Sequence, residues 1–215
     1  AEGSSSSEAK ASRVRVGLVD GEFLLRLSVA WPEHPGTARV VIELPTAAMR
    51  KFAGKPAFYN LQERRVLGVG SFGAVKLVVD RTTHVGYALK CMKKEPPSLT
   101  GSVGKNWSKA VLRERRVLSS LRDLHHPFVP GLIESYQDRH ILYMLLPLVP
   151  GDELSTHLRR TKPLNLASVR FYAGCVALAI EFLHSQAIVY RDLKPENLLL
   201  DHEGYCKVVD FGFAK

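Results

Sequence analysis

The feature that most constrains the fold is a run of three closely spaced glycines with a β-type segment directly after it. The run occupies residues 68–75 and reads Gly-Val-Gly-Ser-Phe-Gly-Ala-Val. The same glycine spacing opens dinucleotide-binding folds, but in those folds a helix follows the glycines. Here residues 76–80 are short and β-branched, and after a turn-like stretch residues 87–92 form another strand-like segment. The pattern predicts a glycine-tipped hairpin rather than a Rossmann unit, and an ordinary flexible hairpin remains the alternative.

A lysine and a glutamate follow this hairpin in positions where both could point inward. Lys90 lies 17 residues after Gly73, on the second strand-like segment. Residues 106–121 have helical apolar spacing, and Glu114 falls on the apolar stripe of that helix. The stripe consists of Val111, Leu118 and Leu121. The alternative is a surface glutamate that pairs weakly with the arginines beside it.

The middle of the chain predicts a hairpin and a long helix. His-His-Pro-Phe at 125–128 ends the preceding helix, and residues 134–137 and 140–146 read as two strands. Adjacent histidines in such a turn diverge and have no third ligand nearby in sequence, so we do not expect a metal site there. A helix is predicted over 166–184. Its apolar stripe is Val169, Val176, Ile180 and Leu183.

Two segments near the end group acids, a lysine and an amide. Residues 190–197 read Tyr-Arg-Asp-Leu-Lys-Pro-Glu-Asn, and Asp-Phe-Gly follows at 210–212. These residue types supply a base, a phosphate-screening cation and oxygen ligands for a metal, as phosphoryl transfer requires. A capped turn and a reverse turn are the alternatives, but eight ordered positions followed by a correctly spaced Asp-Phe-Gly make chance a poor explanation.

Together these motifs resemble the catalytic domain of protein kinases over residues 58–215. Tyr190 in place of the usual His, together with residues 198–201, 204–205 and 213–215, is similar to the AGC group of Ser/Thr kinases and within it to cAMP- and cGMP-dependent kinases. The resemblance implies an α+β, protein-kinase-like fold. It would have a complete β-rich N-lobe and only the start of the helical C-lobe, preceded by a small β-rich N-terminal segment.

The resemblance implies ATP and Mg²⁺, and it assigns catalytic roles to individual residues. Asp192 would accept or orient the proton of the substrate hydroxyl, and Lys194 would screen the transferring phosphate. Lys90, positioned by Glu114, would neutralise the α and β phosphates. The Mg²⁺ ligands would be Asn197 and Asp210.

The implied ATP-binding residues come from the glycine loop, the adenine pocket and the linker between lobes. They are Leu67, Gly68, Gly70, Ser71, Phe72, Gly73, Val75, Ala88, Lys90, Leu146, Pro147, Val149, Glu153 and Leu199. Glycines allow backbone N–H groups to approach phosphate oxygens closely. Pro147 and Val149 would bind adenine through the backbone, and Leu146 would be the gatekeeper. A regulatory hydrophobic column would contain Leu118, Leu132, Tyr190 and Phe211. Any buried apolar residue would look the same, so these assignments depend on the family.

Two acids suggest protein substrates with Ser or Thr acceptors near basic residues. Glu153 lies in Gly-Asp-Glu, where the family has Gly-Gly-Glu, and Glu196 resembles the acid that recognises an arginine near the acceptor. Asp152 replaces the second glycine, which puts the local backbone shape in doubt. The alternative for Glu153 is an acid that complements a helix dipole.

The chain divides by pattern into three parts. Residues 1–57 form a β-rich region of unknown role, with 1–12 expected to be disordered; 58–150 form the N-lobe and hinge; 151–215 form a partial C-lobe. Within the first part, alternating segments predict a three-stranded meander. The segments are 14–18, 25–31 and 40–44, with a turn at 20–21 and a short helix over 46–52.

Composition excludes several classes of protein. The +9 charge is dispersed without aromatic-interleaved stripes, so we expect no nucleic-acid partner. The longest nearly apolar run, 141–150, holds two prolines, so we expect no membrane span. The start of the chain is polar and lacks an apolar segment, so we expect no signal peptide. Three scattered cysteines without C-x-x-C spacing argue against disulfides or zinc and favour the cytoplasm.

The ends of the chain leave two functions open. The first residue is not Met, and Lys215 precedes any activation loop, so we expect a kinase catalytic segment that is cut short. The alternative is a catalytically inactive nucleotide-binding or protein-interaction module. The regulatory partner and the activating signal have no signature in the sequence.

Overall fold

The computed structural model describes residues 13–19, 22–29, 40–45, 55–70, 73–94, 102–161 and 163–215. The chain divides into two compact units, Ala1–Lys51 and Phe52–Lys215. In the first unit, strands pair antiparallel in the order β1-β2-β3, which is the expected meander. The strands are β1 Arg13–Val19, β2 Glu22–Val29 and β3 Val40–Pro45. The helix predicted over 46–52, the continuation of a strand to Trp31 and the disorder predicted over 1–12 all lie outside the described residues.

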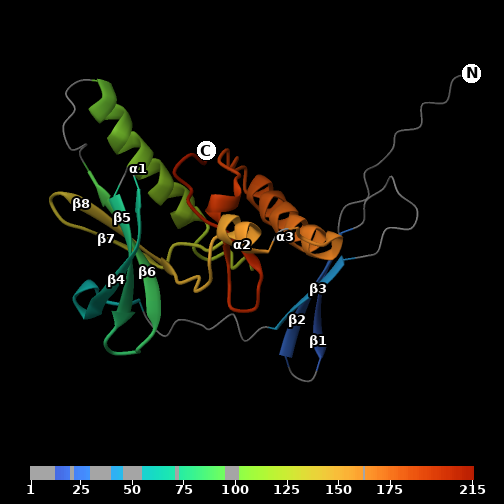
Figure 1. Cartoon of the computed structure of the whole chain (residues 1–215). Coiled ribbons are helices and arrows are strands. Elements are labelled where there is room, and N and C mark those ends of the chain that lie inside the picture. Colours follow the sequence, from blue (N-terminus) through green and yellow to red (C-terminus); the bar gives the residue numbers. More distant parts are fainter. Residues whose placement is uncertain are drawn as a thin grey trace, which may run out of the picture. The chain divides into compact units, whose positions relative to one another are not determined.

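The second unit contains a five-stranded antiparallel sheet in the order β4-β5-β6-β8-β7 (Figure 1). Its strands are β4 Leu61–Gly70, β5 Gly73–Asp80, β6 Gly86–Lys93, β7 Glu134–Gln137 and β8 Ile141–Pro147. Gly70 pairs with Gly73, so the glycine run is the tip of a hairpin and is followed by a strand. The hairpin prediction is confirmed, and the Rossmann alternative is excluded.

The strand register gives this sheet two different faces. Lys90 pairs with Val75 on β5 and with Met144 on β8, and paired residues lie on the same face of an antiparallel sheet. The neighbouring positions along each strand point the other way and form a hydrophobic cluster. The cluster contains Val78, Tyr87, Leu89, Cys91 and Leu145. The cluster therefore holds the sheet together from one side, while Lys90 lies on the opposite side.

Helix α1 spans Ser102–Ser120 and begins four residues before the predicted start at 106. Residues on the helical i, i+3, i+4 repeat are buried against the rest of the unit. They are Val111, Glu114, Val117 and Leu118 of the helix and Leu121 just after it. The helix is fastened to β6 by Lys90 and Glu114, and to β7 by Arg115, whose Nε donates to Ser135 Oγ at 3.3 Å.

The C-terminal part consists of two helices and a two-stranded ribbon. They are α2 Leu154–Arg160, α3 Leu166–Ser185, β9 Leu198–Leu200 and β10 Cys206–Val208. Asn165 begins α3 by accepting a hydrogen bond from the Ser168 N–H at 2.8 Å. The helix packs against β10, and the ribbon leads into the Asp-Phe-Gly segment.

The buried face of α3 differs from the predicted stripe. The buried apolar positions are Cys175, Leu178, Ala179 and Leu183, whereas Val169 is 46% exposed. The helix is apolar around most of its circumference, so the spacing fits more than one stripe and only Leu183 was placed correctly on the buried face. With a mean hydropathy of 1.6 over 18 residues, α3 is also long and apolar enough to cross a membrane, a property that core helices of globular proteins share. This property is not evident from uninterrupted apolar runs, because Arg170 and Glu181 interrupt the apolar sequence of the helix.

Candidate functional site

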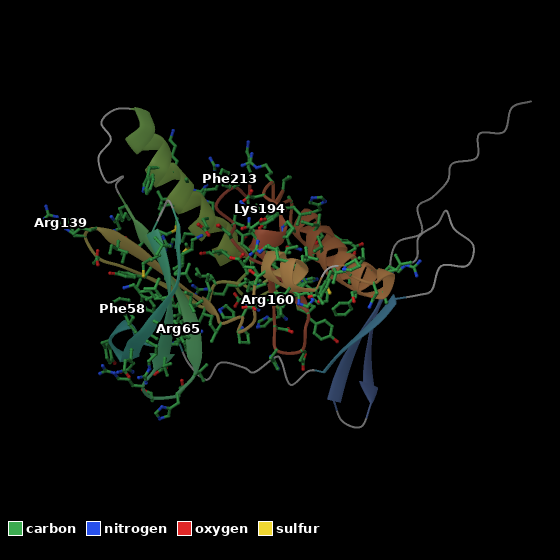
Figure 2. All side chains as sticks on the ribbon, viewed as in Figure 1. Phe58, Arg65, Arg139, Arg160, Lys194 and Phe213 are labelled. Atoms are coloured by element: carbon green, nitrogen blue, oxygen red, sulfur yellow. The ribbon has the colours of Figure 1, made fainter. Side chains whose placement is uncertain are left out.

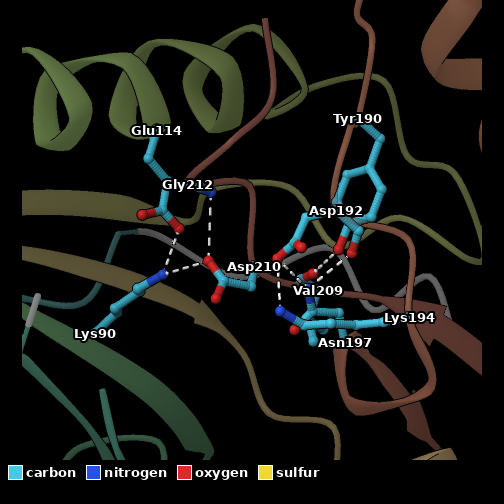
Figure 3. Close-up of polar contacts among 9 residues, drawn as sticks. All are labelled: Lys90, Glu114, Tyr190, Asp192, Lys194, Asn197, Val209, Asp210 and Gly212. Atoms are coloured by element: carbon cyan, nitrogen blue, oxygen red, sulfur yellow. Dashed lines mark hydrogen bonds and ion pairs between the residues drawn. The ribbon is translucent and has the colours of Figure 1, made fainter. Parts of the chain in front are cut away.

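Three distant segments meet at the ammonium group of Lys90 (Figure 3). Lys90 Nζ donates to Glu114 Oε1 on α1 at 2.6 Å and to Asp210 Oδ1 at 2.9 Å. The Glu114 side chain is only 1% exposed, whereas that of Asp210 is 49% exposed. The helix placed Glu114 on its buried stripe, and the sheet register placed Lys90 on the face that Glu114 reaches. The pair therefore connects β6, α1 and the Asp-Phe-Gly segment.

The charges in this group stabilise one protonation pattern. Burial lowers the pKa of Lys90, but the nearby carboxylates of Glu114 and Asp210 outweigh it and raise that pKa above its ordinary value. Burial raises the pKa of Asp210, yet the charge and hydrogen bond of Lys90 hold it below its ordinary value. Lys90 is thus protonated and Asp210 ionised at neutral pH.

The Glu114 carboxylate is hydrogen-bonded through only one of its two oxygens in the described part of the chain. Burial raises its pKa, while Lys90 opposes that shift. Among the described residues, Glu114 Oε2 has no hydrogen-bond partner although it is buried. Since an unpartnered buried oxygen costs free energy, the ion pair with Lys90 is the main interaction that stabilises the Glu114 carboxylate.

A second polar group surrounds Asp192. Its Oδ2 accepts from Asn197 Nδ2 at 2.7 Å and from Lys194 Nζ at 2.9 Å, and its backbone oxygen also accepts from Asn197 at 2.9 Å. The 3₁₀ helix Pro195–Asn197 makes these contacts possible, because it turns the chain back toward Asp192. The side chain of Asp192 is 22% exposed, so its carboxylate is fixed in place and still reachable.

A tyrosine joins the two polar groups. The Tyr190 hydroxyl donates to the Val209 carbonyl at 2.5 Å, directly before Asp210, and the rings of Tyr190 and Phe211 meet edge-on at 5.5 Å. Two neighbouring residues adopt left-handed backbone angles, Arg191 with φ +66° and Asp210 with φ +61°. Such angles in residues other than glycine concentrate at functional sites, because surrounding contacts must hold them.

All four residues of the hydrophobic column expected from the resemblance are buried. Leu118 and Leu132 are joined through the backbone, where the Leu132 N–H donates to the Leu118 carbonyl at 3.2 Å. All four side chains of the column are at most 2% exposed. They are Leu118, Leu132, Tyr190 and Phe211.

The sheet register brings together four of the predicted ATP-binding residues. Ala88 pairs with Leu146 and lies two residues before Lys90, which pairs with Val75, so all four lie on one face of the sheet. Leu67 is 42% exposed on β4. Ser71 and Phe72 lie outside the described residues.

The three glycines of the loop differ in what they require. A Cβ on Gly73 would fall 1.9 Å from the Cys91 carbonyl oxygen, so this position demands glycine for close strand contact. A Cβ on Gly68 or Gly70 would meet no described atom within 4 Å. Those two positions therefore present an open backbone, which suits the approach of a large anion.

The linker after β8 is bound to β9. A Cβ on Gly151 would lie 2.1 Å from the Leu200 carbonyl oxygen, and the Leu200 N–H donates to the Asp152 carbonyl at 3.0 Å. Glu153 then forms a bridge with Leu199. The Asp152 carboxylate turns outward to Arg160 at 2.5 Å, so replacing a glycine at this position leaves the linker intact.

The two predicted substrate acids lie in different settings. Glu153 is the residue before α2, where its side chain caps no backbone N–H and its carboxylate accepts a hydrogen bond from the Ser155 hydroxyl at 2.8 Å. Glu196 is exposed on the 3₁₀ helix. Pro147 ends β8, and Val149 follows it in the linker.

The contact of Arg191 with the chain after Asp-Phe-Gly was not predicted from the sequence. Arg191 Nε donates to the Phe213 carbonyl at 2.8 Å and so fixes the chain just after Asp-Phe-Gly. Its position between Tyr190 and Asp192 was the only available signal. Among the described residues, no group of three or more His, Cys, Asp or Glu side chains is arranged to hold a metal ion.

Comparison with known proteins agrees with this geometry. The protein kinase domain family matches residues 61–215. A cAMP-dependent protein kinase catalytic subunit of Dictyostelium discoideum is 44% identical over 156 residues, 73% of this chain and 23% of that protein. A cGMP-dependent protein kinase of Plasmodium berghei (strain Anka) is 41% identical over 156 residues, 73% of this chain and 17% of that protein.

A third relative gives the same result. The cAMP-dependent protein kinase catalytic subunit 2 of Drosophila melanogaster is 44% identical over 156 residues, 73% of this chain and 42% of that protein. The chain thus spans between 17% and 42% of the length of these three relatives. Because the family match covers well over half of the chain and includes every motif described above, the chain belongs to the protein kinase domain family.

Proposed function

We propose that this chain is a catalytic segment of a Ser/Thr protein kinase, which transfers the γ-phosphate of ATP to Ser or Thr side chains of proteins. The observation that carries the proposal is the junction of Lys90, Glu114 and Asp210, with Asp192 fixed nearby by Lys194 and Asn197. Relatives that are named as cyclic-nucleotide-dependent kinases support it.

The residues at the site fit ATP and Mg²⁺. Asn197 donates its amide N–H groups to Asp192, which leaves its amide oxygen as the acceptor, and the half-exposed Asp210 carboxylate is ionised. Amide and carboxylate oxygens are the ligands that Mg²⁺ prefers. When bound, Mg-ATP would supply the transferable phosphoryl group and neutralise part of its charge.

Each residue of the site then has a distinct task. Lys90 stays protonated between two carboxylates and would bind phosphate oxygens. Asp192 would orient the acceptor hydroxyl and take its proton, since its carboxylate is fixed and still exposed to solvent. Lys194, whose side chain is 46% exposed and pairs with Asp192, would screen the charge of the transferred group.

We also propose a preference for basic peptides. Glu196 is exposed beside the Asp192 network and would pair with an arginine near the acceptor. Glu153 would contribute a second carboxylate when a basic side chain of the peptide replaces Ser155 as its hydrogen-bond donor. Glu196→Gln should raise KM for an arginine-containing peptide and leave KM unchanged for a peptide in which alanine replaces that arginine.

The decisive experiment measures radiolabelled phosphate transfer from Mg-ATP to a Ser-containing peptide by the 215-residue chain. Asp192→Asn keeps the shape of the side chain and should lower the rate by about 10²- to 10⁴-fold. The matched control is Asp123→Asn, because Asp123 is an exposed aspartate between α1 and β7. Equal rates for Asp192→Asn and the unmodified chain would refute the proposal. A folded chain that binds ATP and transfers nothing would indicate a nucleotide-binding module instead.

We place the protein in the cytoplasm, with protein substrates and no nucleic-acid partner. All three cysteines, Cys91, Cys175 and Cys206, are buried free thiols, which suits a reducing compartment. The apolar α3 packs against β10 and lies inside the kinase match, so we interpret it as a helix of the kinase domain and not as a membrane span.

A further inference from the structure

The outer face of α1 carries three cations around one exposed leucine. We call this surface the basic α1 face, and it consists of Lys109, Leu112, Arg113 and Arg116. The spacing i, i+3, i+4, i+7 places all four on the same side of a helix. All are exposed, and Leu112 is 53% exposed. They line a shallow cavity of about 250 Å³.

The cations of this face serve no described contact within the chain. Lys109, Arg113 and Arg116 form no hydrogen bond or ion pair with any described residue. Other cations nearby are paired, since Arg115 bonds to Ser135 and Arg122 to Glu134. Like charges three and four residues apart repel one another, so the arrangement opposes helix stability in the isolated chain.

We propose that the basic α1 face binds an acidic segment of a partner protein. An apolar side chain of that segment contacts Leu112 in the cavity, and carboxylates on either side of it pair with Arg113, Arg116 and Lys109. Charge complementarity selects the partner, because the face has three cations and no described acid. Glu114, the acid next in sequence, is buried on the opposite side of the helix.

The size and composition of the face favour a peptide over other anions. Eight residues of helix from Lys109 to Arg116 extend only about 12 Å, the length of a few peptide residues. None of the described residues that line the cavity is aromatic, whereas proteins that bind single-stranded nucleic acids stack bases on aromatic rings. A single exposed leucine supplies little area for insertion into a lipid surface.

The proposal is independent of phosphoryl transfer and is tested by binding. The probe is a fluorescein-labelled peptide with a central leucine flanked by three glutamates on each side, titrated with the 215-residue chain and followed by anisotropy. Arg113→Glu should weaken binding by about tenfold or more, since it replaces attraction by repulsion. Leu112→Ser should weaken binding of this peptide several-fold but not binding of a peptide with serine at the centre.

The control variant is Arg139→Glu. Arg139 projects from the β7–β8 hairpin, is exposed, and gives the same change in net charge (Figure 2). The proposal predicts unchanged affinity for this variant. Equal losses for Arg113→Glu and Arg139→Glu, or no measurable binding of the peptide, would overturn it. Binding of a single-stranded oligonucleotide or of phosphatidylserine vesicles as tight as that of the peptide, and equally sensitive to Arg113→Glu, would also overturn it in favour of general anion binding.

Discussion

Because the fold holds His126 in its neutral form, the free energy of unfolding should decrease as the pH falls from about 7 to about 5. Burial, together with the positive charge of Lys207, lowers the pKa of His126 to about 4. Its ring stacks on Phe182 at 4.3 Å, and Nδ1 accepts a hydrogen bond from the Phe128 N–H at 3.2 Å. Protonation would place a hydrogen on Nδ1, where the Phe128 N–H already points, and would add a second cation beside Lys207.

The magnitude follows from proton linkage. The unfolded chain binds a proton at this histidine near pH 6.5, whereas the folded chain does so only near pH 4. Stability from the neutral ring is therefore fully present above pH 6.5 and is lost as pH falls toward 4. Lowering the pH from about 7.5 to about 5 should remove about 2 kcal/mol of the free energy of unfolding.

Urea unfolding followed by tryptophan fluorescence at several pH values measures this loss. Other acids titrate in the same range, so the informative quantity is the difference between the unmodified chain and His126→Phe, which keeps the stacked ring and removes the titration. At every pH the variant should be less stable by a constant amount, because it lacks the hydrogen bond with Phe128. At low pH the unmodified chain also loses the histidine contribution, so the difference in free energy of unfolding between the two proteins should shrink by about 2 kcal/mol. Parallel pH profiles for the two proteins would refute the reasoning.

Two further predictions concern close packing. Gly151→Ala should lower the free energy of unfolding by about 1 to 3 kcal/mol, because its Cβ would clash with the Leu200 carbonyl. A Cβ on Gly174 in α3 meets no atom within 4 Å, so Gly174→Ala should raise the free energy of unfolding by about 0.5 to 1 kcal/mol. Thermal melting of both variants checks this, and a Gly151→Ala protein as stable as the unmodified chain would contradict it. Burial raises the pKa of Cys206 to about 12 and that of Cys175 to about 11, so both thiols should resist iodoacetamide at pH 8 in the folded chain and react in urea. Native-state labelling detected by mass spectrometry would show that this part of the fold opens.

Local patterns predicted the sheet well and the helices less well. Turn residues and strand-like segments located four of the five strands of the large sheet, and the glycine-tipped hairpin implied the fifth, β4, without giving its bounds. The start of α1 was placed four residues late, since Gly104 in its first turn disfavours helix by propensity alone. The buried side of α3 could not be read from spacing because the helix is apolar on most sides.

The site was predictable to the extent that its residues lie in short motifs. The spacing of Lys90 and Glu114 indicated a strand and an inward helix position. Their meeting with Asp210, 120 residues after Lys90, depends on tertiary packing that no local pattern encodes. The same reason hid the bond from Arg191 to Phe213 and the contact of Gly151 with Leu200.

The central position of β6 also limits how this protein can change over evolution. Because β6 pairs with β5 on one side and β8 on the other, inserting or deleting one residue before Lys90 would have to shift the register with both neighbours at once. The shift would also exchange the two faces of the strand and turn Lys90 into the cluster around Leu89 and Leu145. β6 should therefore tolerate substitutions but not single-residue insertions or deletions. Around β6, the length of the chain should vary only in the turn at 81–85 and in the loop between β6 and α1.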